Sequence, residues 1–280
     1  QYPAVIAARR RDVMNVYSIG EKKMKGMIFA LSTLLSSMAF ADSHGESWAG
    51  LNLSEASAMQ MQLCSLQPRK TMADYDKVFN AYIDWSKENG VQTYAMRATP
   101  LFGGPEPGSG MEFQWIDMLV SPFAVSGNGW DKWMNTESGQ KLNKQWQETA
   151  NCRVAFHAVA SMFLDREALA HDSRVISLNW CTRNDGVTWD NLMARHTTMA
   201  ASRPDGAPVK AWTLLFPSLG IRNAPGEFAH MLSFADTAGL MAWENQLAND
   251  GGWRQREDYQ TSYASCTGSN VYRTEILNRP

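Results

Sequence analysis

Two histidines stand in segments that alternate apolar and polar residues, a pattern typical of β-strands. His157 lies in the segment 152–163, and His230 lies in the segment 227–235. A histidine that faces a cleft can accept one proton near neutral pH, because its ordinary pKa is about 6.5. We therefore interpret His157 and His230 as candidate catalytic bases.

Arginine, tryptophan and carboxylate side chains alternate in the same way along other predicted strands. Arg97, Trp115 and Asp117 lie on two consecutive strands, and Arg273 lies on the last one. If these faces point into a cleft, they offer an arginine and a carboxylate that can position an anionic or phenolic substrate. Arg97, Trp115, Asp117 and Arg273 are thus candidate ligand-binding residues. The competing interpretation is that the arginines and carboxylates pair with one another at strand edges and that the histidines are structural.

The remaining motifs do not predict a cofactor or a metal. His196 lies one helical turn from Met193 and Met199, which favours a helix-face residue over a haem ligand. The Gly- and Pro-rich segment 102–110 lacks the strand–loop–helix context of a phosphate site and is interpreted as a hairpin connection. Five tryptophans are expected to pack helices onto sheets or, alternatively, to form the walls of an aromatic pocket: Trp130, Trp133, Trp146, Trp243 and Trp253.

The elements that must position these residues occur twice in the same order. Strands are predicted at 59–65, 91–99, 112–120 and 152–163, with a helix from Thr71 to Gly90 and a second helical region at 130–149 that is interrupted near Gly139. The second set has strands at 175–181, 209–216, 227–235 and 270–277, with helices at 189–201, 238–247 and 253–264. Each set is a βαββαβ unit.

The two units share residues at matching positions as well as the order of their elements. Four residues recur 117 positions later, namely Cys64, Thr71, Pro100 and Gly103, which match Cys181, Thr188, Pro217 and Gly220. We interpret this as a duplication. The predicted organisation is an upstream segment with a signal peptide at 1–41, a loose lead-in at 42–58, a first repeat at 59–163, a linker at 164–174 and a second repeat at 175–280.

A βαββαβ unit follows the ferredoxin-like plan, in which the first and fourth strands are antiparallel neighbours. Cys64 and Cys181 end their first strands, and Cys152 and Cys266 begin their fourth strands. The plan therefore predicts the disulfides Cys64–Cys152 and Cys181–Cys266. The alternative, a metal site built from all four cysteines, lacks the C-x-x-C pairs that such sites use.

A ferredoxin-like sheet carries helices on one face only, so two copies can bury their other faces against each other as a barrel. In this plan, and in the stretch from Trp133 to Leu142 (WMNTESGQKL), the chain resembles the dimeric α+β barrel superfamily, with NIPSNAP-like and EthD-like members. The resemblance implies an α+β fold made of two tandem ferredoxin-like repeats, a pseudo-dimeric barrel within one chain. Its members include cofactor-free monooxygenases, isomerases and haem-binding chlorite dismutase-like proteins.

The first part of the chain has the features of an export signal. Met24 and Lys25 precede a mostly apolar stretch at 26–40, which ends in an A-x-A cleavage pattern at Ala41. The stretch is shorter than the roughly 20 apolar residues that a membrane-spanning helix needs. We expect translation to start near Met24, cleavage after Ala41, and a bacterial Sec-type route to a periplasmic or secreted location. The alternative is a buried N-terminal helix.

Composition limits the partners. The 26 Lys and Arg residues are balanced by 28 Asp and Glu residues, without a basic stripe, which argues against binding to nucleic acid or to an anionic membrane. We expect an exported protein without a cofactor that binds a small, partly apolar molecule between sheet and helices. The alternatives are a cofactor-independent enzyme of the monooxygenase or isomerase kind and a non-catalytic structural or interaction protein.

Overall fold

The computed structural model describes residues 47–103 and 112–280. The signal peptide predicted at 1–41 lies outside the described residues. The first half of the described chain contains β1 (Ser47–Trp48), β2 (Leu51–Asn52), β3 (Ser57–Leu66), α1 (Met72–Glu88), β4 (Tyr94–Phe102), β5 (Trp115–Ser121), α2 (Phe123–Asn135), α3 (Glu137–Thr149) and β6 (Ala150–Leu164).

The second half follows one turn of 3-10 helix at Ala168–Ala170 and has the same order of strands and helices as the segment from β3 to β6. It contains β7 (Ser173–Arg183), α4 (Trp189–Ala201), β8 (Val209–Pro217), β9 (Phe228–Phe234), α5 (Thr237–Asn249), α6 (Gly252–Ser262) and β10 (Ala264–Asn278). The predicted helix at 189–201 has the observed bounds, whereas β10 begins six residues before the predicted strand at 270–277.

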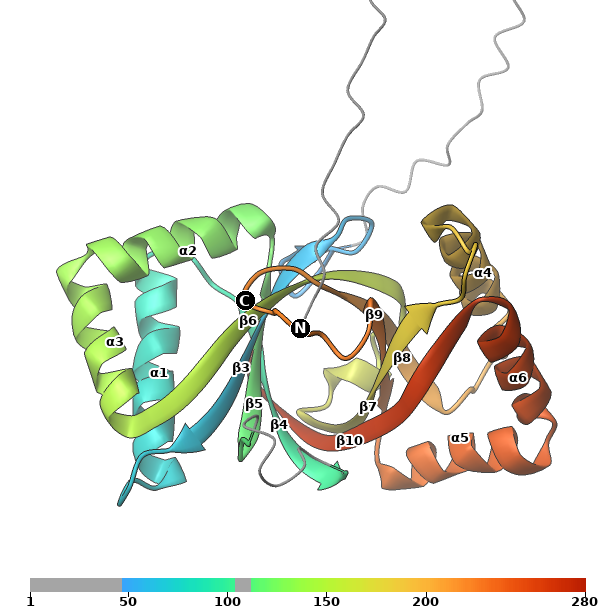
Figure 1. Cartoon of the computed structure of the whole chain (residues 1–280). Coiled ribbons are helices and arrows are strands. Elements are labelled where there is room, and N and C mark those ends of the chain that lie inside the picture. Colours follow the sequence, from blue (N-terminus) through green and yellow to red (C-terminus); the bar gives the residue numbers. More distant parts are fainter. Residues whose placement is uncertain (1–46, 104–111) are drawn as a thin grey trace, which may run out of the picture. The chain divides into compact units, whose positions relative to one another are not determined.

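Eight strands form one closed antiparallel barrel, in the order β10-β4-β5-β3-β6-β8-β9-β7. Within each half the first strand pairs with the third and with the fourth, so β3 lies between β5 and β6, and β7 lies between β9 and β10. The halves join where β6 pairs with β8 and where β10 pairs with β4. Helices α1 to α3 cover the barrel on one side and α4 to α6 on the other (Figure 1).

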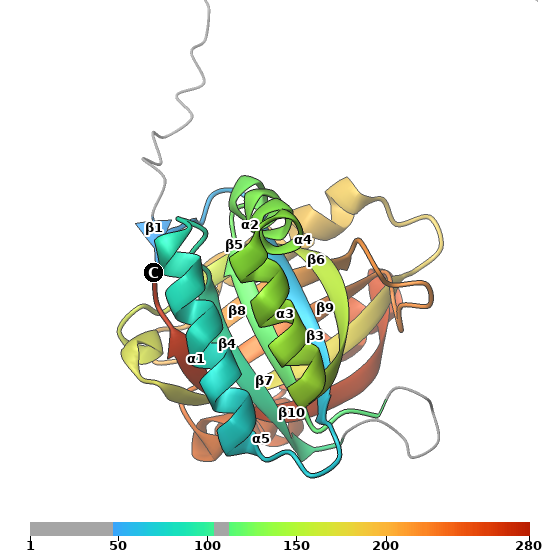
Figure 2. The same ribbon diagram turned by 90° about the vertical axis from the view of Figure 1, so that its left-hand side faces the viewer.

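Local sequence explains the helix that covers the first half. Thr71 and Asp74 form the predicted capping box, in which each side chain bonds the backbone N–H of the other residue. Tyr75, Phe79 and Ile83 recur at helical spacing and are buried against the sheet. Helix α1 thus packs its apolar face on the sheet. Helix α3 lies beside it over the strands of this half (Figure 2).

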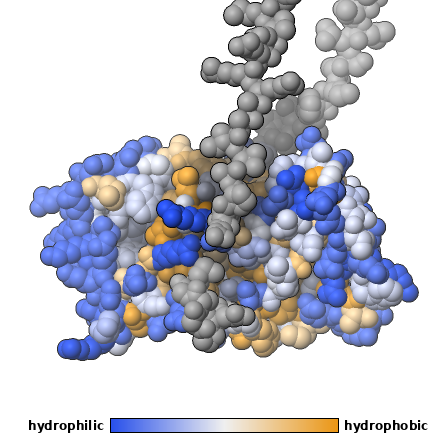
Figure 3. All heavy atoms as spheres, viewed as in Figure 1, coloured by the Kyte–Doolittle hydropathy of each residue, from blue (hydrophilic) through white to orange (hydrophobic). Residues whose placement is uncertain are grey.

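The alternation of side chains along the strands separates two kinds of core. Residues that point inward fill the barrel, and among them are five methionines, Met59, Met61, Met96, Met118 and Met231. Residues that point outward pack under the helices of each half. In Figure 3 the outer surface of the helices is mostly hydrophilic, and hydrophobic residues show over the strands between them. The inner face of the sheet thus meets the barrel core, and much of its outer face meets the helices.

Both predicted disulfides are present, and all four cysteines take part in them. Cys64 and Cys152 lie opposite each other on β3 and β6, with Cα atoms 4.1 Å apart. Cys181 and Cys266 occupy the same places on β7 and β10. The four-cysteine metal site is therefore excluded. Because disulfides persist in oxidising compartments, the pairs indicate a location outside the cytoplasm.

Two local predictions differ from the structure. The helical region at 130–149 breaks at Thr136, which ends α2 and caps α3, and not at Gly139. Gly139 is instead the site of close approach between these helices, since a Cβ there would lie 2.6 Å from the carbonyl oxygen of Trp133. The lead-in at 42–58 was expected to be loose, but β1 and β2 form a hairpin whose Leu51 is buried in the barrel core.

Within the described part of the chain, the longest apolar helices fall short of what a membrane span requires.

Candidate functional site

A cavity of about 460 Å³ lies between the outer face of the first-half sheet and its helices. Its floor comes from β3, β5 and β6, and its walls come from α1, α2 and α3. The volume falls within the 300–1,000 Å³ that is usual for small-molecule sites. It lies between sheet and helices, the place that the sequence predicts for a bound small molecule.

Aromatic rings form most of the wall. Tyr82 and Trp85 come from α1, Trp130 and Trp133 from α2, and Trp146 from α3. Neighbouring rings meet edge to face, with centroids 5.3 Å apart for Trp85 and Trp133 and 6.2 Å apart for Trp133 and Trp146. Such contacts hold the rings in fixed orientations. The wall is therefore a preformed aromatic surface.

The polar groups in the lining are neutral. The indole N–H of Trp130 donates to Oε1 of Gln60 at 2.8 Å. Gln62 is 6 % exposed and lies on the same outward face of β3, where its carboxamide lines the cavity. The hydroxyl of Thr93, also in the lining, is buried close to the hydroxyl of Tyr82. The carboxamide of Gln62 is thus open to a bound molecule.

Charge is excluded from this lining. None of the described residues that line the cavity is an aspartate, glutamate, lysine, arginine or histidine. An ion would enter without a counter-charge, which is costly in a partly desolvated site. The lining also offers no imidazole or thiolate for a metal or haem iron, since its one cysteine, Cys152, is in a disulfide. The arrangement suits binding rather than proton transfer.

Three of the predicted ligand-binding residues come together, but beneath α1 and outside this cavity. The carboxylate of Asp117 is fully buried and accepts hydrogen bonds from Nε of Arg97 at 3.0 Å and from the indole of Trp115 at 3.0 Å. It also accepts the hydroxyl of Tyr75 at 2.6 Å, and Arg97 pairs with Asp76 as well. Burial raises the pKa of Asp117, and the charge of Arg97 opposes this. The cluster has the geometry of a buried ion pair, in which Nη2 of Arg97 is buried without a hydrogen-bond partner among the described residues.

His157 points into the barrel and is 3 % exposed. Its ring lies 5.9 Å from that of Trp180, and its Nδ1 has no hydrogen-bond partner. Burial lowers the pKa of His157 to about 4, so the ring is neutral at pH 7. The methionine-filled interior leaves a cavity of about 70 Å³ near the β1–β2 hairpin, which is room for a few water molecules.

His230 faces the opposite way, into the helix layer of the second half. One ring nitrogen, Nδ1, accepts from the indole of Trp212 at 2.9 Å, and Nε2 lies 3.1 Å from the hydroxyl of Tyr259. That hydroxyl lies 2.8 Å from Nε2 of His196. Burial and the neighbouring His196 lower the pKa of His230 to about 3, and burial lowers that of His196 to about 4. Both ring nitrogens of His230 are engaged.

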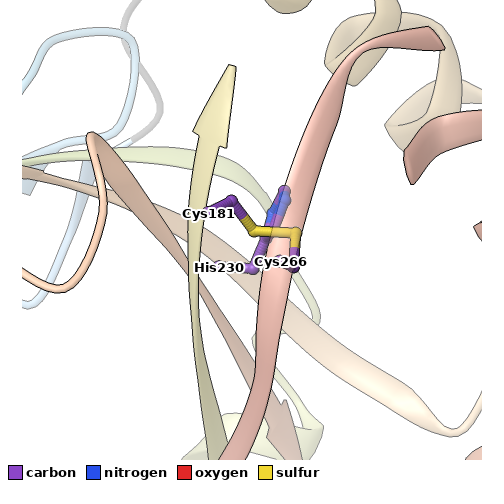
Figure 4. Close-up of side chains that lie close together, drawn as sticks. All are labelled: Cys181, His230 and Cys266. Carbon is purple, nitrogen blue, oxygen red and sulfur yellow. A yellow bond between two sulfur atoms is a disulfide. The ribbon is translucent and has the colours of Figure 1, made fainter. Parts of the chain in front are cut away.

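The side chain of His230 also lies beside the second disulfide (Figure 4). Its ring nitrogen and the sulfur atoms of Cys181 and Cys266 lie within 4.8 Å of one another. These are metal-ligand types, but sulfurs joined to each other are not thiolates and do not bind zinc. With the disulfide formed, this group supplies only one ligand.

The structure therefore separates the predicted site residues into four places. Arg97, Trp115 and Asp117 share one cluster, whereas Arg273 lies on an exposed part of β10. The roles predicted for these residues and for the two histidines stay predictions. Of the tryptophans named as possible pocket walls, Trp130, Trp133 and Trp146 do line the cavity, and Trp243 and Trp253 do not.

Sequence reasoning missed two polar residues of the cavity lining, Gln62 and Thr93. The alternation in Met59–Ser65 did place Gln60 and Gln62 on one polar face of the strand. Such a face usually meets solvent, so glutamine at these positions carried no signal. What reveals them is their place in the cavity lining, which depends on how the helices pack on the sheet.

Comparison with known proteins gives structural likeness alone. No family model and no curated protein matches this chain. A candidate monooxygenase from Lactobacillus acidophilus NCFM is 9 % identical, with a TM-score of 0.47 over 80 % of this chain and 100 % of that one. A candidate monooxygenase from Fusobacterium nucleatum is 10 % identical, with a TM-score of 0.46 over 80 % and 94 %. A candidate chlorite dismutase is 9 % identical, with a TM-score of 0.45 over 80 % and 96 %.

Proposed function

We propose that this protein binds a small, partly apolar molecule in the cavity between the first-half sheet and helices α2 and α3. The observation that carries the proposal is a preformed cavity of about 460 Å³ with aromatic walls and a neutral polar lining that includes the carboxamide of Gln62. A preformed aromatic wall loses little conformational freedom when a ligand enters, which favours affinity. The role is that of a binding protein.

We place the binding site in the first half because, in the second half, side chains fill the space between the sheet and its helices. There, Trp212, His230 and Tyr259 pack between sheet and helices and bond to one another. Export of the protein is part of the proposal, and its support is the pair of disulfides. We further infer that the halves arose by duplication, which the shared order of elements and the matched cysteine positions support.

Native mass spectrometry of protein purified from its own source tests the binding role. We expect a second mass peak from a retained small molecule, which disappears after partial unfolding and refolding. Repeated spectra of ligand-free protein from several growth conditions would count against the proposal.

A second candidate function is cofactor-independent catalysis with His157 as the base. The observation in its favour is the unpartnered Nδ1 of this buried, neutral ring. It requires a substrate to enter the barrel, where the cavity at the hairpin end is about 70 Å³. Turnover of any substrate found for this protein should be lost in His157→Gln, and unchanged turnover would remove His157 from the mechanism. A purely structural role would leave the larger cavity without an occupant.

A further inference from the structure

The lining of the cavity restricts its ligand further than "small and partly apolar". We infer that the ligand is an uncharged, planar ring compound whose edge carries a neighbouring N–H donor and C=O acceptor, as in a cyclic amide. This inference rests on the proposed binding function. It is carried by three features of the lining: its neutrality, its rings and the carboxamide of Gln62.

Neutrality follows from the residues that the cavity lacks. A carboxylate, phosphate or ammonium group buried there would find neither a counter-ion nor a charged hydrogen-bond partner among the described lining residues. Arg97 and Asp117 form a buried ion pair beneath α1, but neither residue lines the cavity. A neutral molecule avoids this desolvation cost.

Planarity follows from the walls. Trp85, Trp133 and Trp146 are held edge to face, so the surfaces they leave toward the cavity are flat and rigid. Flat aromatic surfaces gain most contact from another flat ring, whether stacked or edge-on. A branched aliphatic molecule of the same volume would leave gaps against them.

The donor and acceptor edge follows from Gln62. A carboxamide has two N–H donors and an acceptor oxygen, and those of Gln62 face the cavity. The register of β3 directs Gln62 outward from the barrel, beside Val154 of β6, into the cavity. A cyclic amide forms two parallel hydrogen bonds with such a carboxamide, as two amides do with each other.

The test uses matched ring compounds and isothermal titration calorimetry on the intact protein. The probes are 2-quinolinone, which has the amide edge, 1-methyl-2-quinolinone, which lacks the donor, and quinoline-2-carboxylate, which is charged. We expect 2-quinolinone to bind about tenfold more tightly than the methylated compound, which is the effect of one lost hydrogen bond. The carboxylate should bind most weakly.

Gln62→Met keeps the length of the side chain and removes its hydrogen-bonding groups. We expect this variant to bind both quinolinones with the affinity that the wild type shows for the methylated one, a result that also shows the variant is folded. Gln260→Met, at an exposed position on α6, is the control and should behave as the wild type does. Equal binding of both quinolinones by the wild type would overturn the ligand class while leaving the binding function standing. Binding of none of the neutral rings would overturn both.

Discussion

Trp212 donates its indole N–H to Nδ1 of His230 over 2.9 Å. An indole nitrogen can only donate, so Nδ1 carries a lone pair and the proton of this ring is on Nε2. That proton points to the oxygen of Tyr259, whose own hydroxyl then donates to Nε2 of His196. These hydrogen bonds therefore run in one direction, from Trp212 through His230 and Tyr259 to His196. In this arrangement both His230 and His196 are neutral in the folded protein.

The neutral histidines predict that the protein loses stability in mild acid. The pKa of His157 and that of His196 are about 4 in the folded protein and about 6.5 in an unfolded chain. The unfolded state therefore binds more protons below pH 6.5, and stability that is complete above this pH is lost as the pH falls toward 4. Between pH 7 and pH 5 each of these histidines should cost about 2 kcal/mol of unfolding free energy. Urea denaturation at the two pH values measures this.

A histidine variant separates this effect from general acid sensitivity. His196→Gln should reduce the difference in unfolding free energy between pH 7 and pH 5, because the group that gains a proton on unfolding is removed. The exposed His171 supplies the control, and His171→Gln should leave the difference unchanged. If the unfolding free energy of His196→Gln depended on pH as that of the wild type does, protonation of His196 would not be a cause of the loss of stability in acid.

Because Arg97 and Asp117 form a buried ion pair beneath α1, we expect substitutions of the two residues to have non-additive effects on the free energy of unfolding. Arg97→Met strands the carboxylate of Asp117, which is fully buried, and should destabilise the fold by about 3–5 kcal/mol. The double variant Arg97→Met with Asp117→Leu should recover part of this loss, since no charge is then left alone. Denaturation of the single and double variants gives the coupling energy.

An exposed ion pair supplies the comparison. Asp258, the partner of Arg195, is largely exposed, so Arg195→Met should cost about 1 kcal/mol or less. If Arg97→Met were equally mild, the cluster of Arg97, Trp115 and Asp117 would not be structural. Its earlier interpretation as a ligand-binding group would then be the better one.

We expect the two disulfides, one in each half, to contribute similar amounts to the free energy of unfolding. They join residues separated by 88 and 85 positions, and loops of this size are worth about 4–5 kcal/mol in the chain-entropy description. Replacing Cys64 and Cys152 by alanine, or Cys181 and Cys266, should therefore lower the unfolding free energy by similar amounts. Denaturation without reductant measures both. A pair whose removal changes nothing would argue that its half is held by packing alone.

The elements that sequence predicts well are those that local chemistry determines. The capping box of Thr71 and Asp74 marks the start of α1, and the bounds of β3 and α4 follow from alternation and helical periodicity. The cysteines could be paired because the ferredoxin-like plan makes their strands neighbours. Closure of the barrel also followed, since each sheet had a second apolar face to cover.

What could not be predicted depends on distances between elements. The sequence shows that Trp130 and Trp146 face the sheet, but not that α2 and α3 leave space in front of them. It shows alternation at His157 and His230, but not that one ring lies inside the barrel and the other under the helices. Arg97 and Asp117 were named for a cleft because alternation cannot distinguish a cleft from the underside of α1.

The glycines of α2 allow the most direct measurement of the binding role. Gly129 lines the cavity and has room for a Cβ, whose nearest neighbour would be Val91 at 3.6 Å, whereas a Cβ at Gly127 meets nothing within 4 Å. Native mass spectrometry should find a bound molecule on the wild type and on Gly127→Leu, and much less of it on Gly129→Leu, whose side chain takes up part of the cavity. Retention of as much of this molecule by Gly129→Leu as by the wild type, or ligand-free spectra for all three proteins, would contradict a ligand between this sheet and its helices.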